Sequence, residues 1–195
     1  MAKNKITSKY VCSECGAVTP GWLGRCPSCG KFGTINEEIE ETGATLYENA
    51  LIKAKRVSEV LGVPALSDDS GLCVEALSGA PGIFSARYAG DGKDESNIKL
   101  LLKNMEGVEN RNAEFVSAVV YYDAKKNKTL YYIGKTEGRI LTEKEGHNGF
   151  GYDPVFYSFD LGKSMGVATA EEKNSVSHRA RALNGLKELL KKENI

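Results

Sequence analysis

The feature that most constrains this chain is a pair of Cys-x-x-Cys motifs near its N-terminus. Cys12 and Cys15 form the first motif, and Cys26 and Cys29 form the second after ten intervening residues. Each motif is a tight turn that directs two thiolates toward one point, so the two motifs supply four ligands for a tetrahedral zinc ion. Because no coordination position is left open, the pattern predicts a structural zinc ion that supplies the folding energy of a small module. The alternative is a redox dithiol, which does not require a matched second pair.

The chain as a whole has the composition of a globular protein. Its 195 residues are 41% hydrophobic and 27% charged, which is enough to build a core. The formal net charge is zero, so the overall charge does not indicate a nucleic acid or a membrane surface as partner. No apolar run approaches the roughly 20 residues that span a bilayer, and no signal-peptide hydrophobic region follows Met1. These observations predict a cytoplasmic protein with no membrane partner, where paired cysteines favour metal or redox chemistry.

Helical and strand patterns alternate after residue 44. Helices are expected over residues 45–61, with Thr45 and Glu48 as a capping box, over residues 95–106, and after Ser177. The expected buried stripes are Leu46, Ala50, Ala54, Val57 and Leu61 in the first helix, and Ala182, Leu183, Leu186, Leu189 and Leu190 in the last. A short strand is expected to end at the carboxylates of residues 68–69, a second over residues 72–77, and a hairpin over residues 115–137. Without a regular βαβ repeat, the pattern predicts an α/β fold with a mixed sheet.

The first of three polar clusters is Ser67-Asp68-Asp69-Ser70-Gly71, which follows an apolar run. Adjacent carboxylates at the end of a strand suit a hard cation such as magnesium. One of them can bind the metal and also orient or deprotonate a water molecule. The alternative is a solvated turn, because Asp, Ser and Gly are common turn residues.

The second cluster is Gly149-Phe150-Gly151-Tyr152-Asp153-Pro154. The flanking glycines allow the backbone to approach a ligand and leave the Phe150 ring free to stack on a planar base. Asp153 can accept hydrogen bonds from a ring N–H or an amino group. The alternative is an ordinary aromatic turn that packs on the core.

The third cluster is Lys173 together with Ser177, His178 and Arg179 at the start of the last helix. These donors would gather at a helix N-terminus, which already attracts anions and hydrogen-bond acceptors. The alternative is a capped helix with solvated charges. His147, the other histidine, is interpreted as an ordinary loop residue.

Residues 9–38 resemble the N-terminal zinc finger of the bacterial RadA (Sms) recombination-repair ATPase. The stretch YVCSECGAVTPGWLGRCPSCGKFGTINEE carries this resemblance. The phosphate-binding motif G-x-x-x-x-G-K-[ST] does not occur in the chain, so the ATPase core of that family is not expected.

A second resemblance covers residues 40–190. The motifs EETG, ENA-x-x-KA, DDSGL, GAPGI-x-SARYAG, GFGYDP and EEK-x-x-x-SHR occur in this order. Together they resemble the non-canonical purine nucleoside triphosphate pyrophosphatases, also called inosine/xanthosine triphosphate pyrophosphatases. The resemblance implies an elongated mixed sheet flanked by helices, a homodimer, and magnesium-dependent hydrolysis of ITP, dITP and XTP to the monophosphate and pyrophosphate. It divides the chain into a four-cysteine zinc ribbon over residues 1–38 and an N-terminally truncated pyrophosphatase domain over residues 39–195.

The resemblance also implies roles for individual residues. Asp69 would be the catalytic carboxylate and would bind magnesium together with Glu40, with Glu41 as a close alternative, and Ser70 would contact the substrate. The base pocket would comprise Phe150, Gly151, Tyr152, Asp153, Lys173, His178 and Arg179. An N–H of His178 or Arg179 would favour the 6-oxo group of hypoxanthine or xanthine over the 6-amino group of adenine, because an unpaired buried donor costs about 1–3 kcal/mol.

One element of that family has no counterpart in this chain. The family opens with a strand and a Thr/Ser-x-Asn-x-x-Lys loop that binds the triphosphate, and the nearest text here, Thr34-x-Asn36-x-x-Ile39, lacks the lysine. Lys53 is a weak substitute. Two interpretations follow: an enzyme, with activity impaired by the missing loop, whose zinc ribbon contacts a protein or nucleic acid; or a non-enzymatic or weakly active chimera that acts as a binding module.

Overall fold

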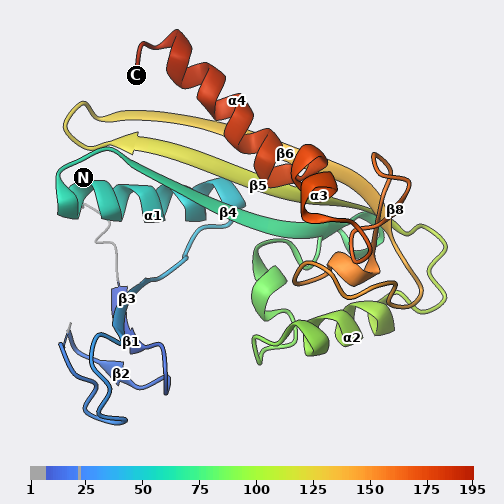
Figure 1. Ribbon diagram of the computed structural model, residues 1–195, viewed down its shortest axis with the longest axis horizontal. Coiled ribbons are helices and arrows are strands. Elements are labelled where there is room, and N and C mark those ends of the chain that lie inside the picture. The colour runs from blue at the N-terminus through green and yellow to red at the C-terminus, as the bar shows by residue number, and fades with distance from the viewer. Residues whose placement is uncertain (1–7, 22) are drawn as a thin grey trace.

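The computed structural model describes residues 8–21 and 23–195, which form a small N-terminal sheet and a larger α/β unit (Figure 1). The small sheet has the strand order β2-β1-β3 and consists of β1 (Ser8–Cys12), β2 (Val18–Thr19) and β3 (Ile35–Ile39). The larger unit contains α1 (Leu46–Leu61), β4 (Ala65–Val74), η1 (Glu75–Leu77), η2 (Gly82–Arg87), α2 (Asp94–Asn104), β5 (Asn112–Asp123), β6 (Lys128–Ile140), η3 (Asp153–Val155), β7 (Phe156–Ser158), β8 (Lys163–Ser164), α3 (Ala170–Val176) and α4 (His178–Lys192).

The large sheet is built around the long hairpin of β5 and β6, which extends across the molecule in Figure 1. Its strand order is β4-β5-β6-β7-β8. The expected α/β class, with an elongated sheet flanked by helices, is confirmed. The sheet is not mixed, however, because each strand pairing in the described part of the chain is antiparallel. The strands that pair follow one another in the chain, which is the arrangement that antiparallel connections produce.

Helices α1 and α4 cover opposite faces of this sheet. Ala50 and Ala54 of α1 pack on Val120 and Tyr122, whereas α4 packs on the neighbouring residues Val119 and Tyr121 through Ala182 and Leu186. Residues 119–122 belong to β5. Because successive side chains of a strand point to opposite faces of the sheet, β5 contacts both helices. The larger core lies at the other end of the sheet, beneath α2, and includes Leu72, Leu101, Met105, Ile140 and Phe156.

Strand β4 is longer than the sequence pattern predicts. The prediction of a short strand ending at the carboxylates, with a second strand after it, is wrong: one strand runs from Ala65 to Val74. Its ladder with β5 is uninterrupted, and Asp69 pairs with Ala118 in the middle of it. The polar run therefore projects side chains alternately to the two faces of a sheet, which a turn would not do.

The expected helix ends and faces are partly confirmed. The Thr45 side chain caps α1 by accepting from Glu48 N, while the Glu48 carboxylate accepts from Ala44 N instead of from Thr45. Val57 and Leu61 are exposed, and the buried position near the end of the helix belongs to Ser58. The buried faces are Leu46, Asn49, Ala50, Ala54 and Ser58 in α1, and His178, Ala182 and Leu186 in α4, whose predicted stripe residue Leu183 is exposed.

None of the helices in residues 8–21 and 23–195 combines the length and the apolar character needed to cross a bilayer.

Candidate active site

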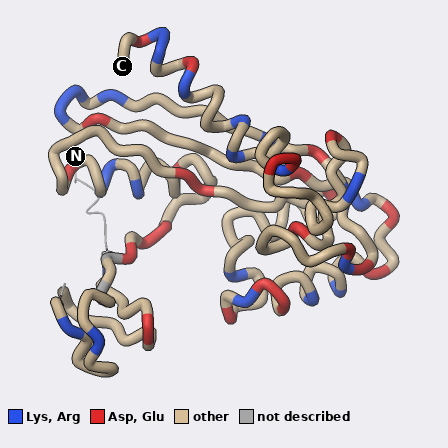
Figure 2. Tube along the Cα trace, viewed as in Figure 1, with Lys and Arg blue, Asp and Glu red and all other residues tan. Residues whose placement is uncertain are grey.

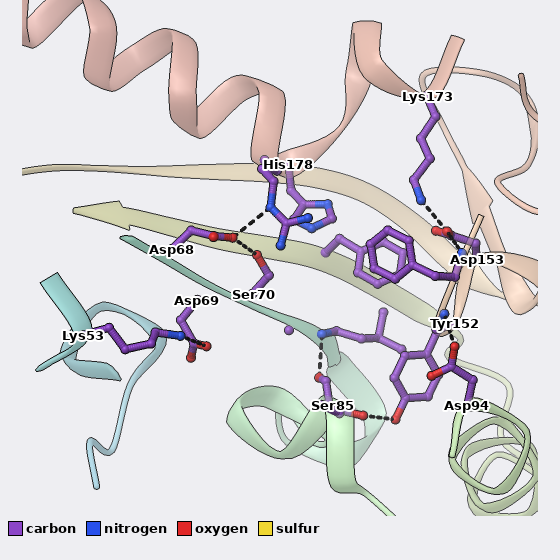
Figure 3. A pocket seen from close by; sticks show the side chains of 17 residues that line it. Lys53, Asp68, Asp69, Ser70, Ser85, Asp94, Tyr152, Asp153, Lys173 and His178 are labelled. Atoms are coloured by element: carbon purple, nitrogen blue, oxygen red, sulfur yellow. Dashed lines mark hydrogen bonds and ion pairs between the residues drawn. The ribbon is translucent and has the colours of Figure 1, made fainter. Parts of the chain in front are cut away.

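A cavity of about 320 Å³ opens between β4, the loop before η3, and the start of α4 (Figure 3). It brings together nine of the predicted site residues: Asp69, Ser70, Phe150, Gly151, Tyr152, Asp153, Lys173, His178 and Arg179. These residues come from segments of the chain more than 100 positions apart, so the fold joins the three polar clusters into one site. Glu40, the remaining residue of that predicted site, lines a different cavity.

At one end of the cavity, Lys53 joins Asp69, which lines the cavity, to Glu41, which does not line it. The Nζ atom of Lys53 lies 2.7 Å from Glu41 Oε1 and 3.0 Å from Asp69 Oδ1. Burial raises the pKa of Asp69, and the charge of Lys53 opposes this rise. Burial also lowers the pKa of Lys53, but its hydrogen bonds with Glu41 and Asp69 outweigh that effect and raise the pKa overall. The lysine is therefore a charged ammonium group between two acids.

The structure distinguishes Glu41 from Glu40. Both glutamates line that different cavity, but the carboxylate of Glu41 also contacts Lys53. The backbone N–H of Gly43 donates to Asn49 Oδ1 at 2.8 Å, which fixes this segment against the first turn of α1. That attachment positions Glu41 beside Lys53, one helical turn further along. The sequence assigned the second metal carboxylate to Glu40 with Glu41 as the alternative, and the geometry favours Glu41.

The two carboxylates fit a divalent cation. Carboxylate oxygens are the ligands that magnesium takes in proteins, usually one or two of them with water and phosphate oxygens. The ammonium group of Lys53, held between Asp69 and Glu41, shows that one positive charge can contact both acids at 2.7–3.0 Å. Asp69 and Glu41 are therefore the residues that could hold magnesium.

Asp68 lies on the face of β4 opposite to Asp69, because adjacent side chains of a strand alternate between faces. Its Oδ2 atom accepts a hydrogen bond from Arg179 Nε at 2.8 Å and lies 3.4 Å from Ser70 Oγ. Figure 3 shows Asp68 and Ser70 side by side at the cavity. The predicted residues Ser70 and Arg179 are thus brought to the same edge of the cavity by an acid that sequence reasoning did not assign to the site. The alternation of side chains along a strand would have identified it, since Asp68 and Ser70 are two positions apart.

Asp153 organises the aromatic loop. Its Oδ2 atom accepts from the backbone N–H of Phe150 at 2.8 Å and forms an ion pair with Lys173. The loop needs glycine at position 149, where φ is +80° and a Cβ atom would collide with the Asp153 carboxylate. The Phe150 ring is 63% exposed, with Lys173 Nζ 4.3 Å from its centroid. The ring is therefore held at the cavity with one side available to a planar ligand.

Tyr152 anchors the same loop to the core. Its hydroxyl donates to the Ser85 carbonyl at 2.9 Å, and burial raises its pKa well above the ordinary value. The neighbouring N–H of Gly151 donates to Asp94 Oδ2 at 2.7 Å. Ser85 and Asp94 were not predicted as site residues. Ser85 lies within the motif GAPGI-x-SARYAG, which could have indicated it, whereas nothing in the local sequence indicates Asp94.

His178 is a buried histidine that lines the cavity. Its ring stacks on Phe115 with centroids 5.0 Å apart and an interplanar angle of 18°, and its Nδ1 atom has no hydrogen-bond partner among the described residues. Burial, together with the charges of Arg179 and Lys173, lowers the pKa of His178 to about 4. The imidazole is therefore neutral at pH 7, with one nitrogen as donor and the other as acceptor.

The four paired cysteines form a separate cluster in the small sheet. The Sγ atoms of Cys12, Cys15, Cys26 and Cys29 all lie within 4.8 Å of one another, and the Cys12–Cys29 and Cys15–Cys26 pairs are 3.7 Å apart. Tetrahedral zinc with ligands at about 2.3 Å separates its sulfur atoms by about 3.8 Å, so this donor set fits zinc. A hydrogen bond with Thr34 lowers the pKa of Cys12 to about 6, which favours the thiolate that a metal needs.

The nearest candidate for a phosphate-binding loop lies largely in strand β3. Asn36 and Ile39 pair with Val11 and Ser8 of β1, inside the small sheet. Thr34 contacts Cys12, and none of these residues lines the cavity at Asp69. The stretch Thr34-x-Asn36-x-x-Ile39 therefore belongs to the cysteine module.

Solved structures share the fold of the larger unit. The Ham1 protein of Staphylococcus aureus superposes with a TM-score of 0.77 and 42% identity, over 80% of this chain and 81% of that one. A HAM1 protein from Coxiella burnetii superposes with a TM-score of 0.75 and 41% identity, over 79% of this chain and 80% of that one. The fold of the larger unit is thus that of an established structural class.

The Ham1 family model matches residues 23–189, and the chain belongs to this family. Similar proteins are a dITP/XTP pyrophosphatase from Staphylococcus epidermidis, 48% identical over 157 residues and 80% of each chain, and one from Thermoanaerobacter sp., 50% identical over 161 residues, 81% of this chain and 80% of that one. The family match begins within the cysteine segment, and the likeness of residues 9–38 to a RadA finger stays a prediction.

Proposed function

We propose that this protein hydrolyses non-canonical purine nucleoside triphosphates, namely ITP, dITP and XTP, to the monophosphate and pyrophosphate. The observation that carries the proposal is the single cavity with Asp69 at one end, linked through Lys53 to Glu41, and an aromatic, hydrogen-bonding pocket at the other. A nucleotide has the same polarity, with phosphates at one end and a planar base at the other. The relatives named dITP/XTP pyrophosphatases, 48–50% identical, support the same activity.

The carboxylate end performs the chemistry. Asp69 accepts a proton from water, the water oxygen bonds to the α-phosphorus, and the bond between that phosphorus and the bridging oxygen breaks to release pyrophosphate. The raised pKa of Asp69 makes it a stronger base than an ordinary aspartate. Asp69 and Glu41 would hold magnesium, which would supply charge stabilisation for the phosphate oxygens. Lys53, displaced from the two acids, neutralises phosphate charge.

The pocket end selects the base. Phe150 offers an exposed ring for stacking, and neutral His178, which lines the cavity, has one ring N–H that can donate to a 6-oxo group. Adenine presents a 6-amino donor at that position, so the buried donor of His178 would lose its partner, at a cost of about 1–3 kcal/mol. This difference favours hypoxanthine and xanthine over adenine.

The test measures pyrophosphate release in magnesium from ITP, XTP and ATP. We expect release from ITP or XTP to exceed release from ATP by at least about tenfold. Asp69→Asn is expected to abolish release, whereas Asp160→Asn, which changes a carboxylate that pairs with Arg181 outside the cavity, is expected to retain it. If concentrated wild-type protein releases no more pyrophosphate than a reaction without enzyme, the proposal is wrong.

We also infer one structural zinc ion per chain, bound by the four paired cysteines. Their spacing and their short sulfur–sulfur distances support this assignment. Metal analysis of freshly purified protein is expected to give one zinc per chain, and none in Cys26→Ser. Wild-type protein without zinc would refute it.

The family resemblance further supports association of two copies of the chain into a homodimer. Analytical ultracentrifugation at micromolar concentration is expected to show a mass of about twice the 21.1 kDa chain. A single monomeric species would contradict this.

A further inference from the structure

A second cavity, of about 660 Å³, adjoins the carboxylate pair on the side away from the base pocket. Its lining comes from both parts of the molecule: Lys9 from β1 of the cysteine module, Arg87 from the end of η2, and Lys53 from α1. Lys53 also lines the first cavity, so the two cavities meet at this residue. A ligand that fills the first cavity and extends past Asp69 therefore enters the second.

The three cations of this second cavity each face an acid. Lys9 Nζ lies 3.3 Å from Glu38 Oε2, and Arg87 Nη1 lies 3.6 Å from Glu41 Oε2. The side chains of Lys9 and Arg87 are 48% and 46% exposed, so both can reorient at little cost. Figure 2 shows the acidic residues along the segment that joins the module to α1.

We propose that this second cavity binds the β- and γ-phosphates of the substrate and the departing pyrophosphate, and that Lys9 of the cysteine module is one of its phosphate-binding residues. The inference rests on the proposed function. It assigns the cysteine module a direct part in the site, because without β1 the cavity would lose Lys9.

The position of the cavity supports this assignment. With the base at Phe150 and His178 and the α-phosphate at Asp69, the next two phosphates must lie beyond Lys53. A triphosphate carries up to four negative charges, and proteins hold such groups with Lys and Arg side chains. Lys9, Lys53 and Arg87 are the three cationic residues that line the second cavity.

Phosphate can bind to Lys53 and Arg87 only when these cations leave their carboxylate partners. Glu41 now engages both Lys53 and Arg87, so these cations have carboxylates as partners. If Asp69 and Glu41 held a divalent cation, Lys53 and Arg87 would be free to exchange those carboxylates for phosphate oxygens. Pyrophosphate is therefore expected to bind in the presence of magnesium and poorly in its absence.

The test measures binding by calorimetry on the full chain with two probes, inorganic pyrophosphate and inosine monophosphate, both with magnesium. We expect Lys9→Ala and Arg87→Ala each to weaken pyrophosphate binding by about tenfold or more while inosine monophosphate binding changes by less than about twofold. Lys9→Arg is expected to retain pyrophosphate binding. The matched control is Lys31→Ala, a lysine of the same module that pairs with Glu14 and does not line either cavity.

Zinc content is measured on every variant to show that the module is intact. If Lys9→Ala loses zinc, the test uses the pyrophosphate affinities of Arg87→Ala and Lys9→Arg instead. The inference then requires that Arg87→Ala weakens pyrophosphate binding and that Lys9→Arg retains it. Unchanged pyrophosphate affinity in zinc-replete Lys9→Ala overturns this inference and leaves the proposed hydrolysis standing. If the wild-type protein neither binds pyrophosphate nor releases it from ITP, both the proposed hydrolysis and the proposed phosphate site are wrong.

Discussion

His178 is the residue whose charge the fold controls most strongly. Its ordinary pKa of 6.5 is lowered to about 4 by burial, with Arg179 and Lys173 adding to the effect. The unfolded chain therefore takes up this proton near pH 6.5 and the folded chain only near pH 4, so acidification between these values favours unfolding. We expect this residue to contribute a fall of up to about 3 kcal/mol in the free energy of unfolding from pH 7 to pH 4.

Urea denaturation at several pH values, on wild type and His178→Gln, measures that contribution. Glutamine does not titrate, so the free energy of unfolding of the variant is expected to fall by about 3 kcal/mol less than that of the wild type between pH 7 and pH 4. Parallel curves for the two proteins would show that the histidine keeps an ordinary pKa in the folded state.

Adjacent glutamates provide a second prediction at the residue scale. Neither glutamate lines the cavity that contains Asp69, but Glu41 contacts Lys53 beside Asp69. We expect Glu41→Gln to lower ITP hydrolysis by at least about 100-fold and to raise the magnesium concentration needed for half-maximal rate. Glu40→Gln, which makes the same chemical change one position earlier, is expected to lower it by less than about fivefold. A larger loss of ITP hydrolysis in Glu40→Gln than in Glu41→Gln would show that Glu40 is the second metal carboxylate.

These residues show what the sequence could and could not determine about the site. Three polar clusters contain the nine residues that share one cavity, and the family resemblance assigned these residues to one site. The choice between Glu40 and Glu41 depends on how Gly43 attaches to Asn49, and this contact is not visible in the order of letters. Asp94 was missed because it acts through Gly151, whose partner lies 57 positions away.

At the scale of elements, the start of α1 can be tested directly. The Thr45 side chain accepts from Glu48 N at 3.1 Å and satisfies one of the free N–H groups of the first turn. We expect Thr45→Ala to lower the free energy of unfolding by about 1 kcal/mol, and Thr45→Ser, which keeps the hydroxyl, to lower it by less than about half of that. Equal losses in the two variants, measured by urea denaturation, would contradict the cap.

Strand β4 explains where sequence reasoning about elements failed. The run Ser67 to Gly71 consists of turn-forming residues, but each one has a partner in β5, and its polar side chains are satisfied from both faces. Asp68 pairs with Arg179 of α4, and Asp69 pairs with Lys53 of α1. Tertiary contacts thus outweigh local propensity at the site, whereas the β5–β6 hairpin, rich in β-branched and aromatic residues, followed its local pattern.

At the scale of the whole molecule, the cysteine module and the larger unit meet beside the catalytic carboxylates. Lys9 of β1 and Arg87 of η2 line one cavity with Lys53. The four-cysteine cluster contacts the end of β1, since Cys12 ends that strand and its sulfur lies 3.7 Å from that of Cys29. A local loss of metal should therefore reach the substrate site through the position of Lys9.

This coupling gives the last prediction. Cys26→Ser removes one of four thiolates, and a module of this size does not fold without its metal. If β1 then no longer presents Lys9, the KM for ITP should rise by about tenfold, while the affinity for inosine monophosphate, which ends at the α-phosphate, should stay within about twofold. Steady-state kinetics and calorimetry on the same preparation measure both. An unchanged KM in zinc-free Cys26→Ser would show that the module is attached to the enzyme without serving its site, and an equal loss for both ligands would place the damage in the larger unit.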